Sequence, residues 1–178
     1  MIMGVRSLGN ALATFKYKFG RTGLEAALPP GPLLLTREQL RTKGTAIGDM
    51  TQNGGLAAAF DDSTTGDFTE GARKDPSADA NVGRNFGEAV TIAKVILFRP
   101  DGNGTSGSNC FPGEGGGTYT IQKSDTGSSY TDVTSVSGTT DKSITITFTA
   151  ASAQYWRVFF TGDSNGGTVQ EMQFYSSS

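Results

Sequence analysis

The stretch KSITITFTA, residues 142–150, constrains the fold of this chain more than any other feature. Its apolar residues Ile144, Ile146 and Phe148 alternate with threonines, which is the period of a strand with one buried face. A helix would scatter the same residues around its axis. We therefore expect a β-strand with these three side chains inward and the threonines toward solvent.

Other segments share this character, being rich in β-branched and aromatic residues: 89–98, 118–124, 153–161 and 168–176. Turn formers separate them, since Gly occupies 25 of the 178 positions. A series of strands without helical segments between them predicts an all-β fold, an antiparallel sandwich or barrel. Trp156 lies inside an apolar strand, so we expect it to pack in the core rather than to present a surface for a sugar.

Charge divides the chain into two parts. Residues 1–48 carry seven Lys or Arg against two Glu, whereas the remainder carries eight basic and fifteen acidic residues. We therefore assign 1–48 to a mostly irregular, basic N-terminal arm and 49–178 to the β-domain. The arm is expected to lie across acidic protein, its own domain or a neighbour's. Contact with nucleic acid is the alternative, but basic residues without a compact cluster leave only a diffuse footprint for it.

The prolines within residues 28–32 divide the arm again. Before them, Leu8, Leu12, Phe15 and Phe19 have helical spacing, while the alternation in TFKYKF is that of a strand, and both readings stay open. We expect this part to dock the arm on other subunits through Phe15, Tyr17, Phe19 and Arg21. After the prolines, Thr36 and Gln39 form a capping-box pattern and Gly44 a stop signal, which predict a short helix near 36–43.

The residue inventory argues against catalysis and against insertion into a membrane. The chain has no His, which removes the commonest general base, and Cys110 lies in a Gly-rich loop without a His partner. No apolar run approaches the roughly 18 residues that span a bilayer. The N-terminal residues do not form a secretory signal, so we expect a non-enzymatic protein made in a cytoplasm.

Five segments occur in an order that resembles the discoidin, or coagulation factor 5/8 type C, family over residues 50–176. They are LAAAFDDSTT (56–65), VGRNFGEAVTIAKVILF (82–98), YTIQKSDTGSSYTDV (119–133), AQYWRVFF (153–160) and VQEMQFY (169–175). The resemblance implies a galactose-binding-like β-sandwich with jelly-roll topology. Two departures are that Tyr130 stands where the family usually has Trp, and that no Trp follows Thr65, where Phe68 is the nearest substitute.

The resemblance also implies ligands. In many members of the family an early loop and the last strand hold a structural calcium, which here corresponds to Asp61, Asp62, Thr65 and Glu171. The alternative is that these residues form only an Asx-type turn and surface charge. Sugars or lipids meet the family's loops at one end of the sandwich. The residues that correspond here are Arg99, Asn103, Asn109 and Phe111, and because those loops lack Trp and Tyr we expect a weak glycan site or none.

Two functions from different classes follow from these features. The first is a structural component of a phage-like virion, such as a capsid decoration, collar or tail protein, with copies of itself and other virion proteins as partners. Release by lysis would bring such a domain outside the cell without a signal peptide, where it could attach to a host-surface glycan. The alternative is a free carbohydrate-binding module of a glycan-degrading system.

Overall fold

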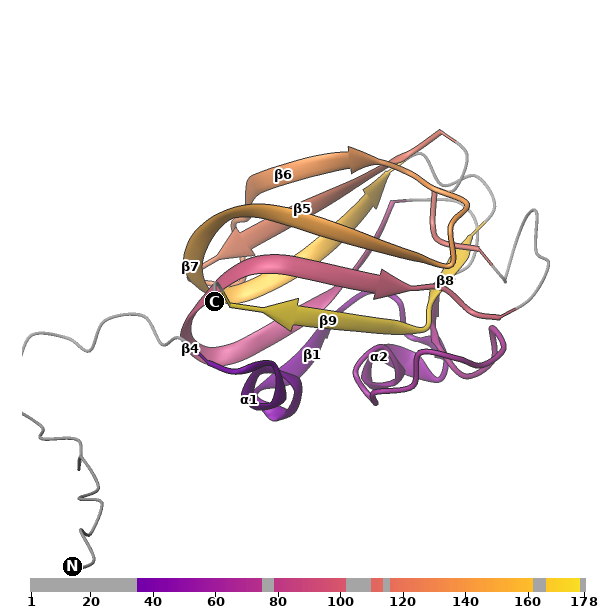
Figure 1. The fold of residues 1–178 in the computed structure, drawn as a ribbon, viewed down its shortest axis with the longest axis horizontal. Coiled ribbons are helices and arrows are strands. Elements are labelled where there is room, and N and C mark those ends of the chain that lie inside the picture. The colour runs from indigo at the N-terminus through magenta and orange to yellow at the C-terminus, as the bar shows by residue number, and fades with distance from the viewer. Residues whose placement is uncertain (1–34, 75–78, 102–109, 114–115, 162–165, 177–178) are drawn as a thin grey trace, which may run out of the picture.

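A computed structural model describes residues 35–74, 79–101, 110–113, 116–161 and 166–176 (Figure 1). Two short helices and nine strands lie in this part of the chain. In chain order they are α1 (Arg37–Thr42), β1 (Thr45–Gly48), β2 (Gln52–Asn53), α2 (Gly55–Ala58), β3 (Ala72–Lys74), β4 (Ala80–Phe98), β5 (Thr118–Ser124), β6 (Thr131–Ser137), β7 (Ser143–Thr161), β8 (Gly167–Val169) and β9 (Glu171–Tyr175). Neither helix is long and apolar enough to span a membrane.

The strands are antiparallel and form a large and a small sheet. The large sheet has the order β1-β4-β7-β5-β6, with β9 also paired to β4, and the small sheet has the order β2-β3-β8. The bend of β4 and β7 is visible where both curl over at one end of the molecule (Figure 1). This arrangement confirms the predicted all-β, galactose-binding-like sandwich.

The two long strands belong to both layers of this sandwich. In one layer the first half of β4 pairs with β1 and with the second half of β7, which continues to β5 and β6. In the other layer the second half of β4 pairs with β9 and with the first half of β7. Register shifts between Asn85 and Val90 and between Ile92 and Lys94 mark the bend in β4. The strands β4 and β7 thus each run from one layer into the other without a break.

Apolar side chains from both layers meet in one core. Trp156 is fully buried, donates from Nε1 to the Ala153 carbonyl at 3.0 Å, and stacks on Phe148 of the opposite layer with 5.9 Å between ring centres. Burial of a large side chain of this kind contributes about 1.5–3 kcal/mol. The predicted core position of Trp156 is confirmed. So is the alternation in 142–150, where Ile146 is buried, Ile144 and Phe148 are partly buried, and the intervening threonines are exposed.

Helix α1 begins and ends as the sequence predicts. The Thr36 hydroxyl accepts from the backbone N–H of Gln39 at 3.3 Å, and the Gln39 side chain accepts from the N–H of Thr36 at 2.9 Å. Gly44 then takes a φ of 80°, which favours Gly and ends the helix. Leu40 on this helix is 1% exposed and belongs to the core.

The buried Arg84 of β4 attaches α1 to the sandwich. Its Nη1 donates to the carbonyls of Leu40, at 3.2 Å, of Lys43, at 2.8 Å, and of Arg41. Its guanidinium carbon lies 4.5 Å from the ring centre of Phe60. Burial lowers the pKa of Arg84, and the nearby Glu171 partly offsets this effect. Arg84 thus satisfies carbonyls at the C-terminal end of the helix that would otherwise lack partners.

Residues 35–48, which the sequence analysis assigned to the arm, therefore pack within the sandwich. Helix α1 contributes Leu40 to the core, and β1 pairs with β4 along the edge of the large sheet. The boundary expected between residues 48 and 49 falls directly after an integral strand. The arm residues Phe15, Tyr17, Phe19 and Arg21 lie outside the described residues.

Candidate functional site

The segment that follows α2, residues 59–71, lies at the end of the sandwich where β8 passes into β9. Met172 donates its backbone N–H to the Ala59 carbonyl at 2.7 Å, and Asp101 donates to Gly66 at 2.6 Å. Gln170, between the two strands, donates its backbone N–H to Phe98 at 2.8 Å. These bonds bring the segment, the end of β4 and the β8–β9 junction together.

The structure brings together the residues for which the resemblance implies calcium. The Glu171 carboxylate accepts from the backbone N–H of Asp62 at 3.2 Å. Asp61 Oδ1 accepts from the N–H of Ser63 at 2.9 Å, which is an Asx turn. Both aspartates act electrostatically on Glu171. The structure therefore contains the Asx turn at Asp61 and also places Asp61 and Asp62 near Glu171.

Glu171 carries the strongest electrostatic perturbation of this set. Its side chain is 1% exposed, and burial, together with the like charges of Asp61 and Asp62, raises the pKa of Glu171 to about 7. Hydrogen bonds from the Asp62 backbone and the Gln173 side chain act in the opposite direction. A carboxyl group in this position carries a proton at mildly acidic pH.

The other members of the set already have protein partners. Asp62 pairs with Arg37 of α1 at 2.6 Å. The Thr65 carbonyl accepts from the Ser63 hydroxyl at 2.7 Å and from Gln170 Nε2 at 3.4 Å. Within the described ranges no three acidic, Cys or His side chains are grouped to hold a metal. Because calcium also takes backbone carbonyl and hydroxyl oxygens among its six to eight ligands, structural calcium stays a prediction.

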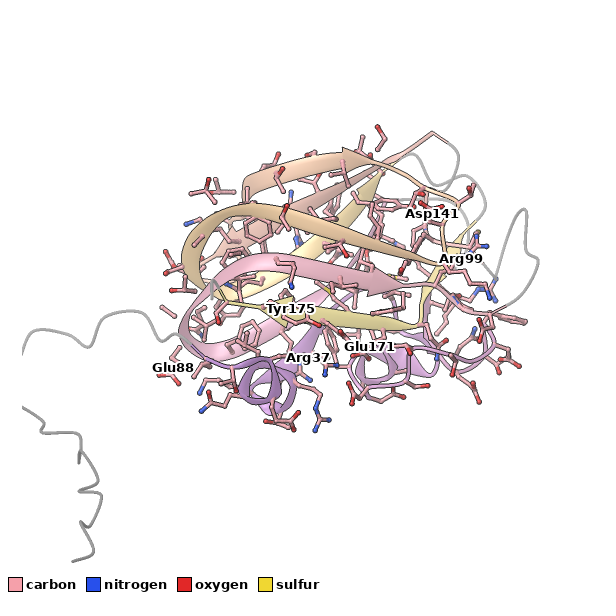
Figure 2. All side chains as sticks on the ribbon, viewed as in Figure 1. Arg37, Glu88, Arg99, Asp141, Glu171 and Tyr175 are labelled. Atoms are coloured by element: carbon pink, nitrogen blue, oxygen red, sulfur yellow. The ribbon has the colours of Figure 1, made fainter. Side chains whose placement is uncertain are left out.

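Two of the four residues expected to contact a glycan, Arg99 and Phe111, lie in the described part of the chain, and they differ in exposure. Phe111 is fully buried and packs edge to face on Tyr119, with ring centres 5.8 Å apart, so its side chain is not available to a ligand. Its position corrects the expectation, because an aromatic residue in a Gly-rich loop turns inward to complete the core. Arg99 is partly exposed and follows directly after β4 (Figure 2). Asn103 and Asn109 lie outside the described residues.

An open hollow of about 500 Å³ lies beside this segment. Its polar lining consists of Asp61, Ser63, Glu70 and Gln170, and small residues of α2 form the rest. Gln170 is fully buried, and its Oε1 has no hydrogen-bond partner among the described atoms. Asp61 and Glu70 are exposed and form no ion pair with a described residue. We define these four polar residues as the acidic hollow.

Of these four residues, only Asp61 is indicated as a site residue by the sequence. Glu70 and Gln170 are a hundred residues apart in the chain, and nothing local in the sequence signals that they meet. Gly66 shows how close the approach is, since a Cβ at that position would lie 2.9 Å from Gln170 Nε2 and would clash with the Glu70 carboxylate. Its φ of 146° also favours Gly.

No protein-family model matches the chain, and no curated protein is significantly similar to it in sequence. Solved structures do match. A chitosan-binding module from a chitosanase/glucanase of Paenibacillus sp. IK-5 is 24% identical, with a TM-score of 0.57, over 77% of this chain and 98% of that one. The lectin domain of lectinolysin, complexed with Lewis B antigen, is 16% identical, with a TM-score of 0.63, over 81% and 100%.

A third match is CpGH89CBM32-5 from Clostridium perfringens, complexed with GalNAc-β-1,3-galactose. It is 14% identical, with a TM-score of 0.56, over 80% of this chain and all of that one. At these identities the likeness shows the fold alone. The fold is the discoidin-like, galactose-binding-like sandwich that the order of the sequence segments predicts.

Proposed function

We propose that this chain is a non-catalytic carbohydrate-binding domain. The support is its fold, which it shares over three quarters of its length with a chitosan-binding module and with domains solved in complex with Lewis B antigen and with GalNAc-β-1,3-galactose. These likenesses favour the free carbohydrate-binding module of the sequence analysis over the virion component. A fold alone does not determine function, so the proposal depends on a site.

The observation that carries the proposal is the acidic hollow. It combines an open concave shape with the exposed carboxylates of Asp61 and Glu70 and the partly exposed hydroxyl of Ser63. Each of these exposed groups can accept a hydrogen bond from a ligand, and the carboxylates make the stronger, charge-assisted ones. Sugars present hydroxyl or ammonium donors in abundance, and a hollow of this size accommodates one or two sugar rings.

The charge of the hollow favours an amino sugar. Asp61 and Glu70 are both acidic, and residues 49–178 carry fifteen acidic against eight basic groups. A protonated glucosamine unit offers an ammonium group to these carboxylates and a hydroxyl to Ser63. The non-catalytic part of the proposal is supported by the lack of His in the chain and by the burial of the Cys110 thiol, which is 4% exposed.

The test is isothermal titration of the full chain with a glucosamine oligosaccharide and with the same oligosaccharide N-acetylated, below the pKa of the amine. We expect binding to the cationic probe and at least about fivefold weaker binding to the neutral one. Glu70→Gln should reduce affinity for the cationic probe by a similar factor. Asp125→Asn, which removes one exposed charge from the β5–β6 turn, is the matched control and should leave the affinity unchanged.

Two outcomes would overturn the proposal. One is the absence of binding to either oligosaccharide. The other is an equal effect of Glu70→Gln and Asp125→Asn, because this would indicate attraction to the net charge of the domain rather than recognition in the hollow.

A further inference from the structure

A second hollow lies on the outer face of the five-stranded layer. On the second half of β7, Trp156, Val158 and Phe160 point into the core, so the alternating residues Tyr155, Arg157 and Phe159 lie on the opposite, partly exposed face. The hollow has a volume of about 320 Å³, and its lining includes Asp49, Asn81, Gly127, Tyr130, Tyr155 and Arg157. We call it the tyrosine groove, and it shares no residue with the acidic hollow.

Neighbouring side chains hold Arg157 in place within the groove. Its guanidinium carbon lies 3.7 Å from the ring centre of Tyr130 and 5.4 Å from that of Phe159. Its Nε donates to Gln122 Oε1 at 2.8 Å, and Gln122 in turn donates to Asp132 at 2.7 Å. An arginine stacked on aromatic rings and bonded through Nε has lost most of its rotamer freedom before any ligand arrives.

The groove has a net positive character. Asp49 is its acidic residue, but Lys74 pairs with that carboxylate at 2.7 Å, and the backbone N–H of Asn81 donates to it at 2.7 Å. Arg157, in contrast, bonds to a neutral amide and has no carboxylate partner among the described residues. The charge that remains for a ligand is therefore that of the guanidinium.

Two tyrosines supply the remaining recognition surface. Tyr130 and Tyr155 are both partly exposed, and neither phenolic oxygen has a hydrogen bond to a described atom. Such side chains combine an apolar ring, on which the C–H face of a sugar packs, with a polar tip that bonds to its hydroxyls. Gly127 lies against the ring of Tyr155, where a Cβ would come within 2.7 Å of a ring carbon, so the turn and the ring are fitted to each other.

We propose that the tyrosine groove binds an acidic saccharide, with Arg157 holding the carboxylate of a uronic acid and the two tyrosines contacting its ring. A planar guanidinium with fixed orientation matches a carboxylate in bidentate geometry. The flanking Asn81 offers a neutral amide for ring hydroxyls. This site goes beyond the proposed function, because its charge is opposite to that of the acidic hollow and its residues come from other elements.

The experiment titrates the full chain with an oligogalacturonate and with its methyl ester, which keeps the rings and removes the charge. We expect binding to the acid and at least about tenfold weaker binding to the ester. Arg157→Gln should weaken binding of the acid by a similar factor, and Tyr155→Phe, which removes only a hydroxyl, by a few-fold. Lys94→Gln is the matched control, because it also takes a cation from a ring, that of Tyr175 at 4.0 Å, in the other layer.

Every outcome decides the proposal. The proposal would be overturned by equal affinity for acid and ester, by no binding to either, or by equal effects of Arg157→Gln and Lys94→Gln. If Arg157→Gln does not fold, Tyr155→Phe and the comparison of acid with ester decide.

The variants separate the two sites. Arg157→Gln should preserve binding of the glucosamine oligosaccharide, and Glu70→Gln should preserve binding of the oligogalacturonate. Loss of amino-sugar binding alone would therefore count against the proposed function and leave this inference intact.

Discussion

At the scale of single residues, Glu171 couples folding to pH. Burial beside Asp61 and Asp62 raises the pKa of its carboxyl group to about 7, above the 4.5 of an ordinary glutamate. The folded state thus holds this proton more tightly than the unfolded state. The stabilisation is complete at pH values below about 4.5 and is lost as the pH rises through 7.

Glu171→Gln should remove this dependence. Relative to the native chain, we expect the variant to gain on the order of 2 kcal/mol of stability at pH 8 and little at pH 4.5, because Gln stays neutral and still accepts from the Asp62 backbone. Urea denaturation of both chains across this range, with EDTA present, measures the difference. A difference that does not change with pH would contradict the prediction.

The same measurement tests for calcium. A cation bound at Glu171 would favour the ionised carboxylate and lower its pKa. If the implied calcium site exists, added calcium should stabilise the native chain and reverse the advantage of Glu171→Gln at pH 8. If the acids form only a turn, curves with calcium and with EDTA should coincide.

Gly83 is a second residue at which a small change should alter stability, because its backbone leaves no room for a Cβ atom. It lies on β4 opposite Arg157, and a Cβ there would clash with the Trp156 carbonyl oxygen and lie 2.6 Å from Arg157 Cα. Gly83→Ala should therefore force β4 and β7 apart, cost roughly 2 kcal/mol of stability and weaken binding in the tyrosine groove. Gly116→Ala, where a Cβ meets open space, is the control. Thermal melting measures the difference, and equal melting temperatures of Gly83→Ala and Gly116→Ala would contradict this prediction.

At the scale of elements, helix α1 is stabilised by hydrogen bonds at both ends as well as by the burial of Leu40. Thr36→Ala removes the hydroxyl that accepts from Gln39 and should cost about 1 kcal/mol, since the first turn then loses a partner for one N–H. Thr36→Ser keeps the hydroxyl and should retain most of the stability. Chemical denaturation measures both, and an equal loss in the two variants would show that the cap does not contribute.

The strands show which local patterns suffice for prediction. Strand 118–124 was predicted with the observed bounds, because Tyr119 and Ile121 mark its buried face. The sequence predicts 142–150 and 153–161 as separate strands, but they form the single strand β7, since the two residues between them include neither Gly nor Pro. Strand β6 was not predicted as an element of its own, because only Val133 and Val136 in it are apolar.

At the scale of the whole molecule, the packed domain begins earlier than the charge boundary suggests. Removal of residues 1–48 deletes α1, β1 and the core residue Leu40. We expect that chain to lose several kcal/mol of stability, because a buried Leu alone contributes about 2–5 kcal/mol. A chain that begins at residue 35 keeps α1, β1 and Leu40 and should therefore be more stable than the chain that begins at residue 49. Equal stability of the two truncated chains, measured by thermal melting, would contradict this expectation.

Most of the candidate sites could not be predicted from the sequence. The order of segments predicted the fold, and through it the neighbourhood of Asp61 and Glu171. The tyrosine groove depends on register, since Asn81 of β4 and Arg157 of β7 come together only when these strands pair, beside Tyr130 of the β5–β6 turn. The acidic hollow likewise joins residues of the segment 59–71 to Gln170, about a hundred residues later. Pairing between distant strands is set by the entire core and not by local spacing.

The sharing of β4 and β7 by both layers has a consequence for synthesis. β4 ends at Phe98, whereas β7 begins at Ser143 and its second half pairs with the first half of β4. During translation, β4 cannot pair fully with β7 until residues near 161 have left the ribosome. Pairing over such a separation is slow and leaves an apolar strand exposed in the meantime. Chaperone demand during translation should therefore peak between the completion of β4 and that of β7.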